Sequence, residues 1–349
     1  MTRLHGFVFP PRLYDVLQLI EPAASMSSGR VASHGPMREQ EDVAVKFSRA
    51  AVTAALGDGL LSFPITDFDK NGRFDAESYR RRLEWFISHE ISAVFVAGGT
   101  GEFFNLSLEE YREVVRVAVG TVNGKLPVIA SAGLSVASGK LFVKAAEEAG
   151  ADGILLMPPY LTECPQDGLV EYAREICDWT DLNIIYYNRG NGVLDVDAVR
   201  QLAASCPNLV GLKDGKGDIQ ALNKIIKTIG DRLVYVGGVP TAEIFAEAYL
   251  SIGVNTYSSA VFNFVPDMAV KFYRELRAGN ADVVKRITND FFIPFVDLRD
   301  RKQGYAVSLI KAGADIIGRP AGCVRAPLVM PTPEERSQLE KLIGIAKQL

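Results

Sequence analysis

A lysine closes a short apolar segment near the middle of the chain, residues 208–213 (Asn-Leu-Val-Gly-Leu-Lys). We predict a β-strand here, with Lys213 on the same face as Gly211 and Leu209 because side chains alternate along a strand. Parallel strands are buried on both faces, so the ammonium is costly to desolvate and its pKa falls. A neutral amine attacks a carbonyl to make an imine. Lys213 is therefore a candidate Schiff-base nucleophile. The alternative is an ordinary strand-end lysine that reaches solvent or pairs with Asp214.

Tyr187 lies near the end of the preceding predicted strand, residues 183–188 (Asn-Ile-Ile-Tyr-Tyr-Asn). Alternation places Tyr187 on one face with Ile185, while Tyr186 points to the other. If the two strands are neighbours, Tyr187 and Lys213 meet at their ends. A phenol there can pass protons to and from a carbinolamine as general acid and base. The alternative is a core tyrosine whose hydroxyl is bonded to backbone.

A glycine-rich turn, Gly98-Gly99-Thr100-Gly101-Glu102, follows another predicted strand. It precedes a helix whose start is marked by Ser107 and, three residues later, Glu110, which is the spacing of a capping box. Small residues let backbone N–H groups approach an anion, and this suits the carboxylate of a 2-oxo acid. Such glycines also serve purely steric needs. Gly237-Gly238 and Ser258-Ser259 lie at the ends of two later predicted strands. The alternative is that they form the phosphate-binding pair of another class of barrel.

Short β-rich segments alternate with amphipathic helical patterns from residue 58 onward, which is typical of βαβ units around a parallel sheet. Eight strands can be counted, the number of a closed (β/α)8 barrel. They end near residues 63, 98, 133, 158, 188, 213, 238 and 259. A doubly wound open sheet also alternates strands and helices, but Pro64-Ile65-Thr66-Asp67 follows the first strand in place of a glycine-rich turn. In a barrel the reactive residues lie at the C-terminal strand ends, where Lys213 and Tyr187 stand.

Three regions are predicted along the chain. Residues 1–45, interrupted by prolines and acidic residues, are expected to be a poorly ordered extension. Residues 46–262 form the catalytic barrel, and 263–349 form a helical segment packed on it. Helical patterns over 266–279, 281–315 and 333–347 are expected to lie outside the barrel and build subunit contacts.

The composition points to a small-molecule enzyme. The 349 residues include 38 Lys and Arg against 42 Asp and Glu, a net charge of -4, so no basic surface for nucleic acid or an anionic membrane is indicated. No apolar run reaches the roughly 18–20 residues of a membrane span. The four cysteines form no CxxC pair and the three histidines no HxH or HExxH cluster. We therefore expect a cytoplasmic protein with no metal and no cofactor.

Three motifs in this order, GGTGE at 98–102, YN at 187–188 and GLKD at 211–214, resemble those of the dihydrodipicolinate synthase and N-acetylneuraminate lyase superfamily of class I Schiff-base enzymes. The resemblance runs from near residue 56 to the C-terminus. It implies a (β/α)8 barrel that assembles as a homo-oligomer, commonly a tetramer. It also implies roles for five residues: Lys213 as the Schiff-base lysine, Tyr187 as the proton-shuttling tyrosine, and Gly99, Thr100 and Gly101 as the cradle of the 2-oxo acid carboxylate.

Two departures separate the chain from the dihydrodipicolinate synthases themselves. Those enzymes usually place two threonines before the GE, whereas Gly99 stands in the first of these positions here. They also have a paired tyrosine after the fourth strand, where Pro158-Pro159-Tyr160-Leu161 offers only one. Both departures disfavour the lysine-biosynthetic reaction.

Longer stretches resemble the branch of the superfamily that dehydrates and decarboxylates a keto sugar diacid in sugar-diacid catabolism. These stretches are LLSFPITDFDKNGRFD, GGTGEFFNLSLEEY, YYNRGN, PNLVGLKDGKGDIQ, YSSAVFNF and GYAVSLIKAGADIIGRPAG. In such an enzyme one lysine serves both steps as the electron sink. Strand-end candidates for binding the substrate hydroxyls are Ser62, Thr66, Asn188, Ser258 and Ser259. An aldolase of 2-keto-3-deoxy sugar acids, a dihydrodipicolinate synthase-like enzyme and a catalytically silent binding or regulatory barrel are the alternatives.

Overall fold

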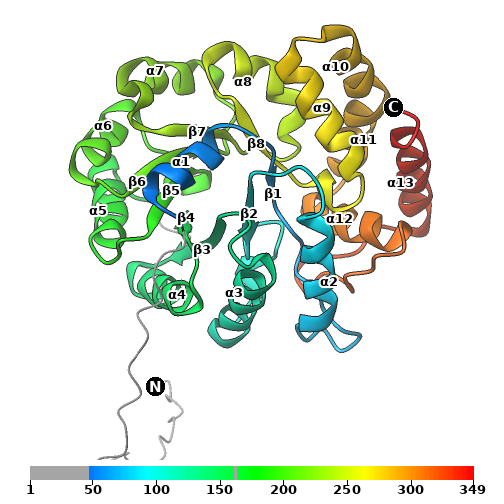
Figure 1. Ribbon diagram of the computed structural model, residues 1–349, viewed down its shortest axis with the longest axis horizontal. Helices are drawn as coiled ribbons and strands as arrows, with labels where there is room; N and C mark the ends of the chain where they lie inside the picture. The colour runs from blue at the N-terminus through cyan, green and yellow to red at the C-terminus, as the bar shows by residue number, and fades with distance from the viewer. Residues whose placement is uncertain (1–46, 161–162) are drawn as a thin grey trace, which may run out of the picture. The chain divides into compact units, whose positions relative to one another are not determined.

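The computed structural model describes residues 47–160 and 163–349, which form a closed barrel of eight parallel strands ringed by helices (Figure 1). β1 closes the ring by pairing with β8. The strands are β1 (Leu61–Ser62), β2 (Ala93–Val96), β3 (Val128–Leu134), β4 (Gly153–Pro159), β5 (Asn183–Asn188), β6 (Leu209–Asp214), β7 (Val234–Gly237) and β8 (Thr256–Ser259). The predicted (β/α)8 barrel is confirmed, and each predicted strand overlaps an observed one. The extension predicted for residues 1–45 lies outside the described residues.

A helix follows each of the first seven strands and covers the outside of the barrel. These helices are α2 (Ala76–Phe86), α3 (Leu108–Val122), α4 (Val136–Ala149), α5 (Gln166–Cys177), α6 (Val196–Ser205), α7 (Ile219–Ile229) and α8 (Ala246–Ile252). α3 illustrates why they form: Tyr111, Val114 and Val115 recur at helical spacing and are buried against the sheet. The predicted capping box is present, because Ser107 and Glu110 each bond the backbone N–H of the other.

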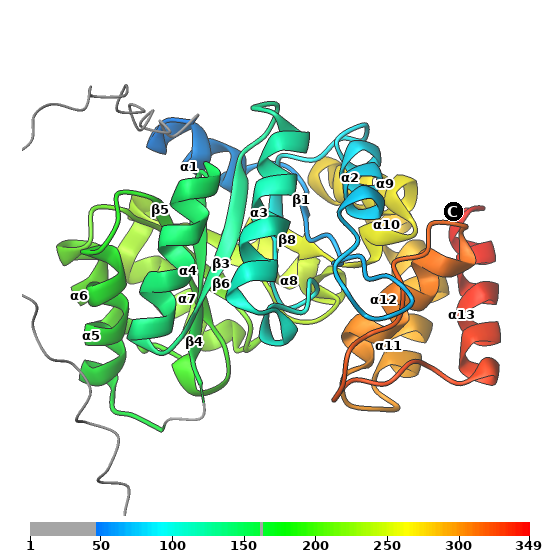
Figure 2. The ribbon, with the colours of Figure 1, turned by 90° about the horizontal axis from the view of Figure 1, so that it is seen from below.

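Apolar side chains form two clusters, one inside the barrel and one between the strands and the outer helices. The inner cluster alternates along the strands and includes Leu61, Phe63, Ala93, Phe95, Ile129, Leu155, Ile185, Val210 and Val236. A short helix that the sequence did not predict, α1 (Arg49–Gly57), adds Val52 and Leu56 to this cluster. Figure 2 shows α1 at one end of the barrel, so the other end is left for the substrate.

Alternation along β6 differs from the prediction. A register shift between Ile184 and Ile185 of β5 lets Leu209 pair with Ile184 and Gly211 with Ile185, so Val210 is an extra residue. Leu209 therefore belongs to the outer core and Val210 to the inner one. The prediction that Leu209 shares a face with Lys213 is wrong. Beyond the shift the register is regular, with Tyr187 opposite Lys213.

The C-terminal region contains α9 (Pro266–Ala278), α10 (Ala281–Ile287), α11 (Ile293–Arg299), α12 (Tyr305–Ile316) and α13 (Pro333–Ala346). The helix predicted over 281–315 is interrupted: a π-helical turn at Thr288–Phe292 joins α10 to α11, and Gly304 at φ 90° separates α11 from α12. Figure 2 shows α11, α12 and α13 grouped beside α2 on one side of the barrel. No helix in the described ranges is both long and apolar enough to cross a membrane.

Candidate active site

A cavity of about 430 Å³ opens at the C-terminal ends of the strands, a size suited to a small molecule. Strand ends supply its floor, including Phe63, Tyr187, Lys213 and Ser258. The C-terminal region supplies a wall, through Phe295, Arg299, Gly304, Ala306, Val307, Ile310 and Leu328. The helices predicted to lie outside the barrel and build subunit contacts therefore include two, α11 and α12, that line the cavity. Whether they also contact another subunit stays a prediction.

Lys213 is 4% exposed and its amine lies between two aromatic rings. Its Nζ is 4.2 Å from the ring centres of both Phe63 and Tyr187. A Cβ at position 238 would lie 2.5 Å from the Lys213 side chain. Gly238 is therefore needed there to leave room for the lysine. Burial, followed by the nearby Arg189 guanidinium, lowers the pKa of Lys213 well below 10.5. The amine is therefore poised to be a neutral nucleophile.

A second buried lysine, Lys311 of α12, provides an internal comparison. Its Nζ forms an ion pair with Glu102 at 2.8 Å, and it does not line the cavity. A carboxylate this close favours the charged, non-nucleophilic ammonium. No carboxylate among the described residues forms an ion pair with Lys213, which does line the cavity. Of the two buried lysines, Lys213 has the surroundings of a nucleophile and Lys311 those of a structural cation.

The Tyr187 hydroxyl lies in a short hydrogen-bonded chain at the cavity. It donates to the carbonyl of Gly238 at 2.7 Å and accepts from Nη1 of Arg189 at 3.1 Å. Burial raises the pKa of Tyr187, and the Arg189 guanidinium opposes this rise. The phenol thus has one hydrogen-bond acceptor, the Gly238 carbonyl, and one cationic hydrogen-bond donor, Arg189. This arrangement suits proton transfer, because the guanidinium stabilises the phenolate that forms when the proton leaves.

Gly99 and Thr100 line the cavity, and a Cβ at Gly99 would meet no atom within 4 Å. Gly101 is turned inward: a Cβ there would be 3.2 Å from the Cα of Ala97, and its carbonyl accepts from the Thr66 hydroxyl at 2.6 Å. We therefore keep Gly99 and Thr100 as the proposed cradle for a carboxylate. Gly101 acts by letting the turn close.

Of the five residues predicted to bind substrate hydroxyls, only Ser258 lines the cavity. Ser62, Asn188 and Ser259 occupy strand positions whose side chains face the outer helices, because alternation sends their neighbours Phe63, Tyr187 and Ser258 inward. Each has another partner: Ser62 the carbonyl of Ala93, Asn188 the backbone of Leu194, and Ser259 the carboxylate of Glu243. Thr66 supports the Gly101 carbonyl. None of these four residues lines the cavity, and each supports neighbouring groups of the protein instead.

Two arginines at the cavity were missed by sequence reasoning. Arg189 follows β5 immediately, and Arg299 ends α11. The position of Arg189, directly after Tyr187-Asn188, was a signal available in the sequence. Arg299 gave no local signal, since only the tertiary fold brings α11 to the strand ends. The Arg189 guanidinium makes the cavity cationic, whereas Arg299 is paired with Asp300. No Asp or Glu lies among the described residues that line the cavity.

The lowered pKa of Lys213 predicts a pH-dependent cost in stability. Between its folded pKa and 10.5, the unfolded chain binds more protons than the folded protein, so the free energy of unfolding rises with pH. We expect Lys213→Met to raise Tm at pH 6 by a few degrees, on the order of 2–4 °C. The gain should shrink at pH 9.5. A gain of equal size at both pH values in calorimetry would rule out desolvation of the ammonium as its cause.

The fold and residues 57–346 match the dihydrodipicolinate synthetase family. Among solved structures, dihydrodipicolinate synthase from Bacillus clausii superposes with a TM-score of 0.78 at 30% identity, covering 84% of this chain and 99% of that one. The enzyme from Oceanobacillus iheyensis superposes with a TM-score of 0.78 at 26% identity, covering 86% and 100%. The chain belongs to the dihydrodipicolinate synthetase family.

Within that family, the chain is similar to proteins named probable 5-dehydro-4-deoxyglucarate dehydratase. The protein of that name from Ralstonia nicotianae is 51% identical over 289 residues, 83% of this chain and 93% of that protein. The one from Rhizobium meliloti is 50% identical over 297 residues, 85% of this chain and 98% of its own length.

Proposed function

We propose that this chain is a decarboxylating dehydratase that converts 5-dehydro-4-deoxy-D-glucarate to 2,5-dioxopentanoate, water and carbon dioxide through an imine on Lys213. The observation that carries the proposal is the buried amine of Lys213, which opens onto a cationic cavity beside Tyr187. The similarity to proteins named as dehydratases of this substrate supports the same reaction. The homo-oligomer implied by the resemblance stays a prediction.

The reaction follows from one imine at C5 of the substrate. The imine acidifies C4, and removal of a C4 proton gives an enamine that expels the C3 hydroxyl as water. The conjugated iminium left behind accepts the electron pair released when the C1 carboxylate departs as carbon dioxide. Protonation at C4, tautomerisation of the C2 enol to the aldehyde with a proton added at C3, and hydrolysis of the imine then release 2,5-dioxopentanoate and the free lysine. Lys213 serves as the electron sink in both steps.

Each group at the cavity has a role in this scheme. Gly99 and Thr100 hold the C6 carboxylate beside the reacting ketone, as small residues at a partly buried turn permit. Tyr187 moves protons to and from the carbinolamine and the departing C3 hydroxyl. The apolar side chains of Val307, Ile310 and Leu328 on the opposite wall exclude water from the iminium.

A second carboxylate on the substrate calls for a second cation, and Arg189 fits better than Arg299. The guanidinium of Arg299 is already bonded to the Asp300 carboxylate at 2.7 and 3.0 Å and to the Pro240 carbonyl at 2.7 Å. Within the described ranges no carboxylate pairs with Arg189, whose Nη1 bonds only the Tyr187 hydroxyl. Its other N–H groups are free to receive a carboxylate.

Product analysis tests the proposed function. Incubation with 5-dehydro-4-deoxyglucarate should release one carbon dioxide for each 2,5-dioxopentanoate formed. Pyruvate together with an aldehyde would instead show an aldolase acting through the same lysine. Absence of any turnover, with no borohydride-trapped adduct, would support a catalytically silent barrel.

Removing Arg189 should separate recognition of a diacid from recognition of a monoacid. For Arg189→Met we expect the half-saturating concentration of the diacid to rise about tenfold or more, because a hydrogen-bonded charge pair is lost. That of pyruvate, measured by borohydride trapping, should rise less, since pyruvate has no second carboxylate and shares only the loss of the bond to Tyr187 and of the electrostatic effect on Lys213. Arg299→Met is the matched control and should have the smaller effect on the diacid. Equal losses for both ligands would contradict the assignment.

A further inference from the structure

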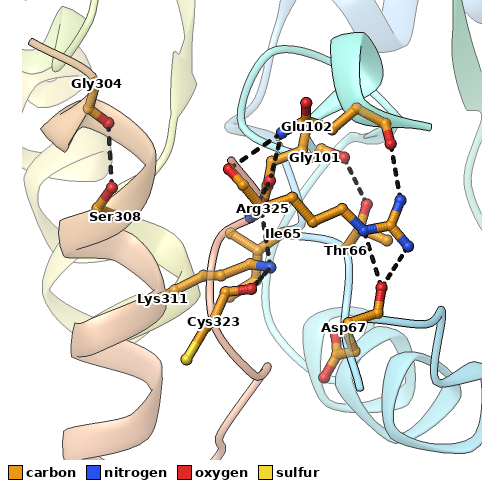
Figure 3. Close-up of polar contacts among 12 residues, drawn as sticks. Ile65, Thr66, Asp67, Gly101, Glu102, Gly304, Ser308, Lys311, Cys323 and Arg325 are labelled. Carbon is orange, nitrogen blue, oxygen red and sulfur yellow. Dashed lines mark hydrogen bonds and ion pairs between the residues drawn. The ribbon is translucent and has the colours of Figure 1, made fainter. Parts of the chain in front are cut away.

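A buried ionic cluster ties the proposed carboxylate cradle to the opposite wall of the cavity. Figure 3 shows Lys311 reaching from α12 toward the loop that ends at Glu102. Glu102 and Lys311 both have side chains that are 0% exposed, and Nζ lies 2.8 Å from Oε1. Nζ also donates to the carbonyl of Cys323 at 3.1 Å and lies 3.9 Å from the ring centre of Phe68. The ammonium therefore has a close contact in three directions.

Glu102 is the last residue of the glycine-rich turn and holds its shape. Its backbone is in the left-handed region at φ 56°, a conformation that a non-glycine residue adopts only when its surroundings enforce it. The N–H of Glu102 donates to the carbonyl of Gly99 at 3.2 Å. A shift of Glu102 therefore moves the cradle residue Gly99 as well. The second carboxylate oxygen of Glu102 accepts from Asn105 and from the backbone N–H of Arg325, both at 3.0 Å.

Lys311 follows immediately after Ile310, which lines the cavity together with Val307 one turn earlier. The Glu102–Lys311 pair thus joins the glycine-rich turn, which holds the proposed carboxylate cradle, to α12, which carries the apolar residues of the cavity wall. Burial lowers the pKa of Lys311, and the Glu102 carboxylate opposes this. A buried ion pair is poor evidence for stability, since its desolvation cost can exceed its attraction. Fixing the separation of two walls is a better reason for its presence.

We propose that Lys311 is a positioning residue that, through Glu102, sets the place of Gly99 and Thr100 for the carboxylate next to the reacting ketone. This inference rests on the proposed function, because it needs Lys213 to form an imine with a 2-oxo acid. It adds that a residue of the C-terminal region, outside the barrel strands and not in the cavity, controls how tightly that carboxylate is held.

Three variants and one control separate positioning from stability. Lys311→Met leaves a buried unpaired carboxylate and should lower Tm. The double variant Glu102→Gln with Lys311→Met carries no unpaired charge, and Gln keeps an acceptor oxygen for Asn105 and Arg325, so most of the Tm should return. The single variant Glu102→Gln completes the cycle. The control Asn208→Ala loses bonds to the carbonyls of Cys177 and Thr180 before β6 and should lower Tm alone.

The readout is the pyruvate concentration that gives half the maximal rate of borohydride trapping on the folded protein. We expect this concentration to rise on the order of tenfold in Lys311→Met, and to stay raised in the double variant although its Tm recovers. Asn208→Ala should leave it unchanged. Should Lys311→Met fail to fold, the double variant carries the test. An unchanged concentration in the double variant overturns the inference, whereas a wild-type protein that forms no pyruvate adduct overturns the proposed function instead.

Discussion

Lys213→Met should lower kcat by about 10,000-fold or more, because removing a covalent nucleophile takes away the main part of such catalysis. Without the imine, neither the loss of the C3 hydroxyl nor the loss of carbon dioxide has an electron sink. Met keeps most of the length of the side chain between Phe63 and Tyr187, so the cavity should keep its shape. The measurement is release of carbon dioxide from 5-dehydro-4-deoxyglucarate by the folded variant.

Lys216→Met is the matched control for that result. Lys216 lies three residues after Lys213, in the loop that follows β6. It is exposed, faces Asp218 at 3.8 Å and does not line the cavity. This variant should keep its activity within about twofold, as surface changes usually do. If Lys213→Met retained more than about 1% of the wild-type rate, the chemistry would have to run through another group.

Tyr187→Phe should lower kcat about 100-fold to 1,000-fold, the range expected when a general acid–base group is removed. The phenyl ring still packs against the amine of Lys213, so the loss is confined to the hydroxyl and its bonds to Gly238 and Arg189. Pyruvate should still be trapped on Lys213, but more slowly. Rapid-quench kinetics of dehydration and of trapping measure the two effects separately.

The adjacent tyrosine gives a close chemical match for this substitution. Tyr186 is also buried in β5, but alternation points it outward, where its hydroxyl donates to the carbonyl of Gly192 at 2.9 Å. Tyr186→Phe loses the same atom and the same kind of bond, yet kcat should change by less than about threefold. Equal losses of kcat in the two variants would remove the role assigned to Tyr187.

Most strand ends could be predicted from the sequence because most barrel strands are apolar runs that stop at a glycine, a proline or a polar residue. That pattern placed Lys213 and Tyr187 at the same edge, and the pairing of β5 with β6 brings them opposite each other. It did not predict the extra residue at Val210, since a bulge leaves the local composition unchanged. A position at a strand end does not by itself place a side chain in the cavity: alternation turns Ser62, Asn188 and Ser259 away from it.

The rest of the site comes from contacts between distant parts of the chain. Local spacing carries no information about which strand end α12 will cover, so the apolar wall and the pairing of Glu102 with Lys311 could not be predicted. A lysine within an apolar helix, as in Ser308-Leu309-Ile310-Lys311-Ala312, does indicate that a buried partner is required. The identity of that partner needs the fold.

Peptide mapping after borohydride reduction in the presence of 5-dehydro-4-deoxyglucarate shows directly whether the substrate forms an imine with Lys213. Reduction converts an imine into a stable secondary amine, so the modified residue can be read by mass spectrometry. We expect one adduct per chain, on Lys213, and none on the second buried lysine, Lys311. An adduct on any other lysine, or inactivation without an adduct on Lys213, would contradict this expectation.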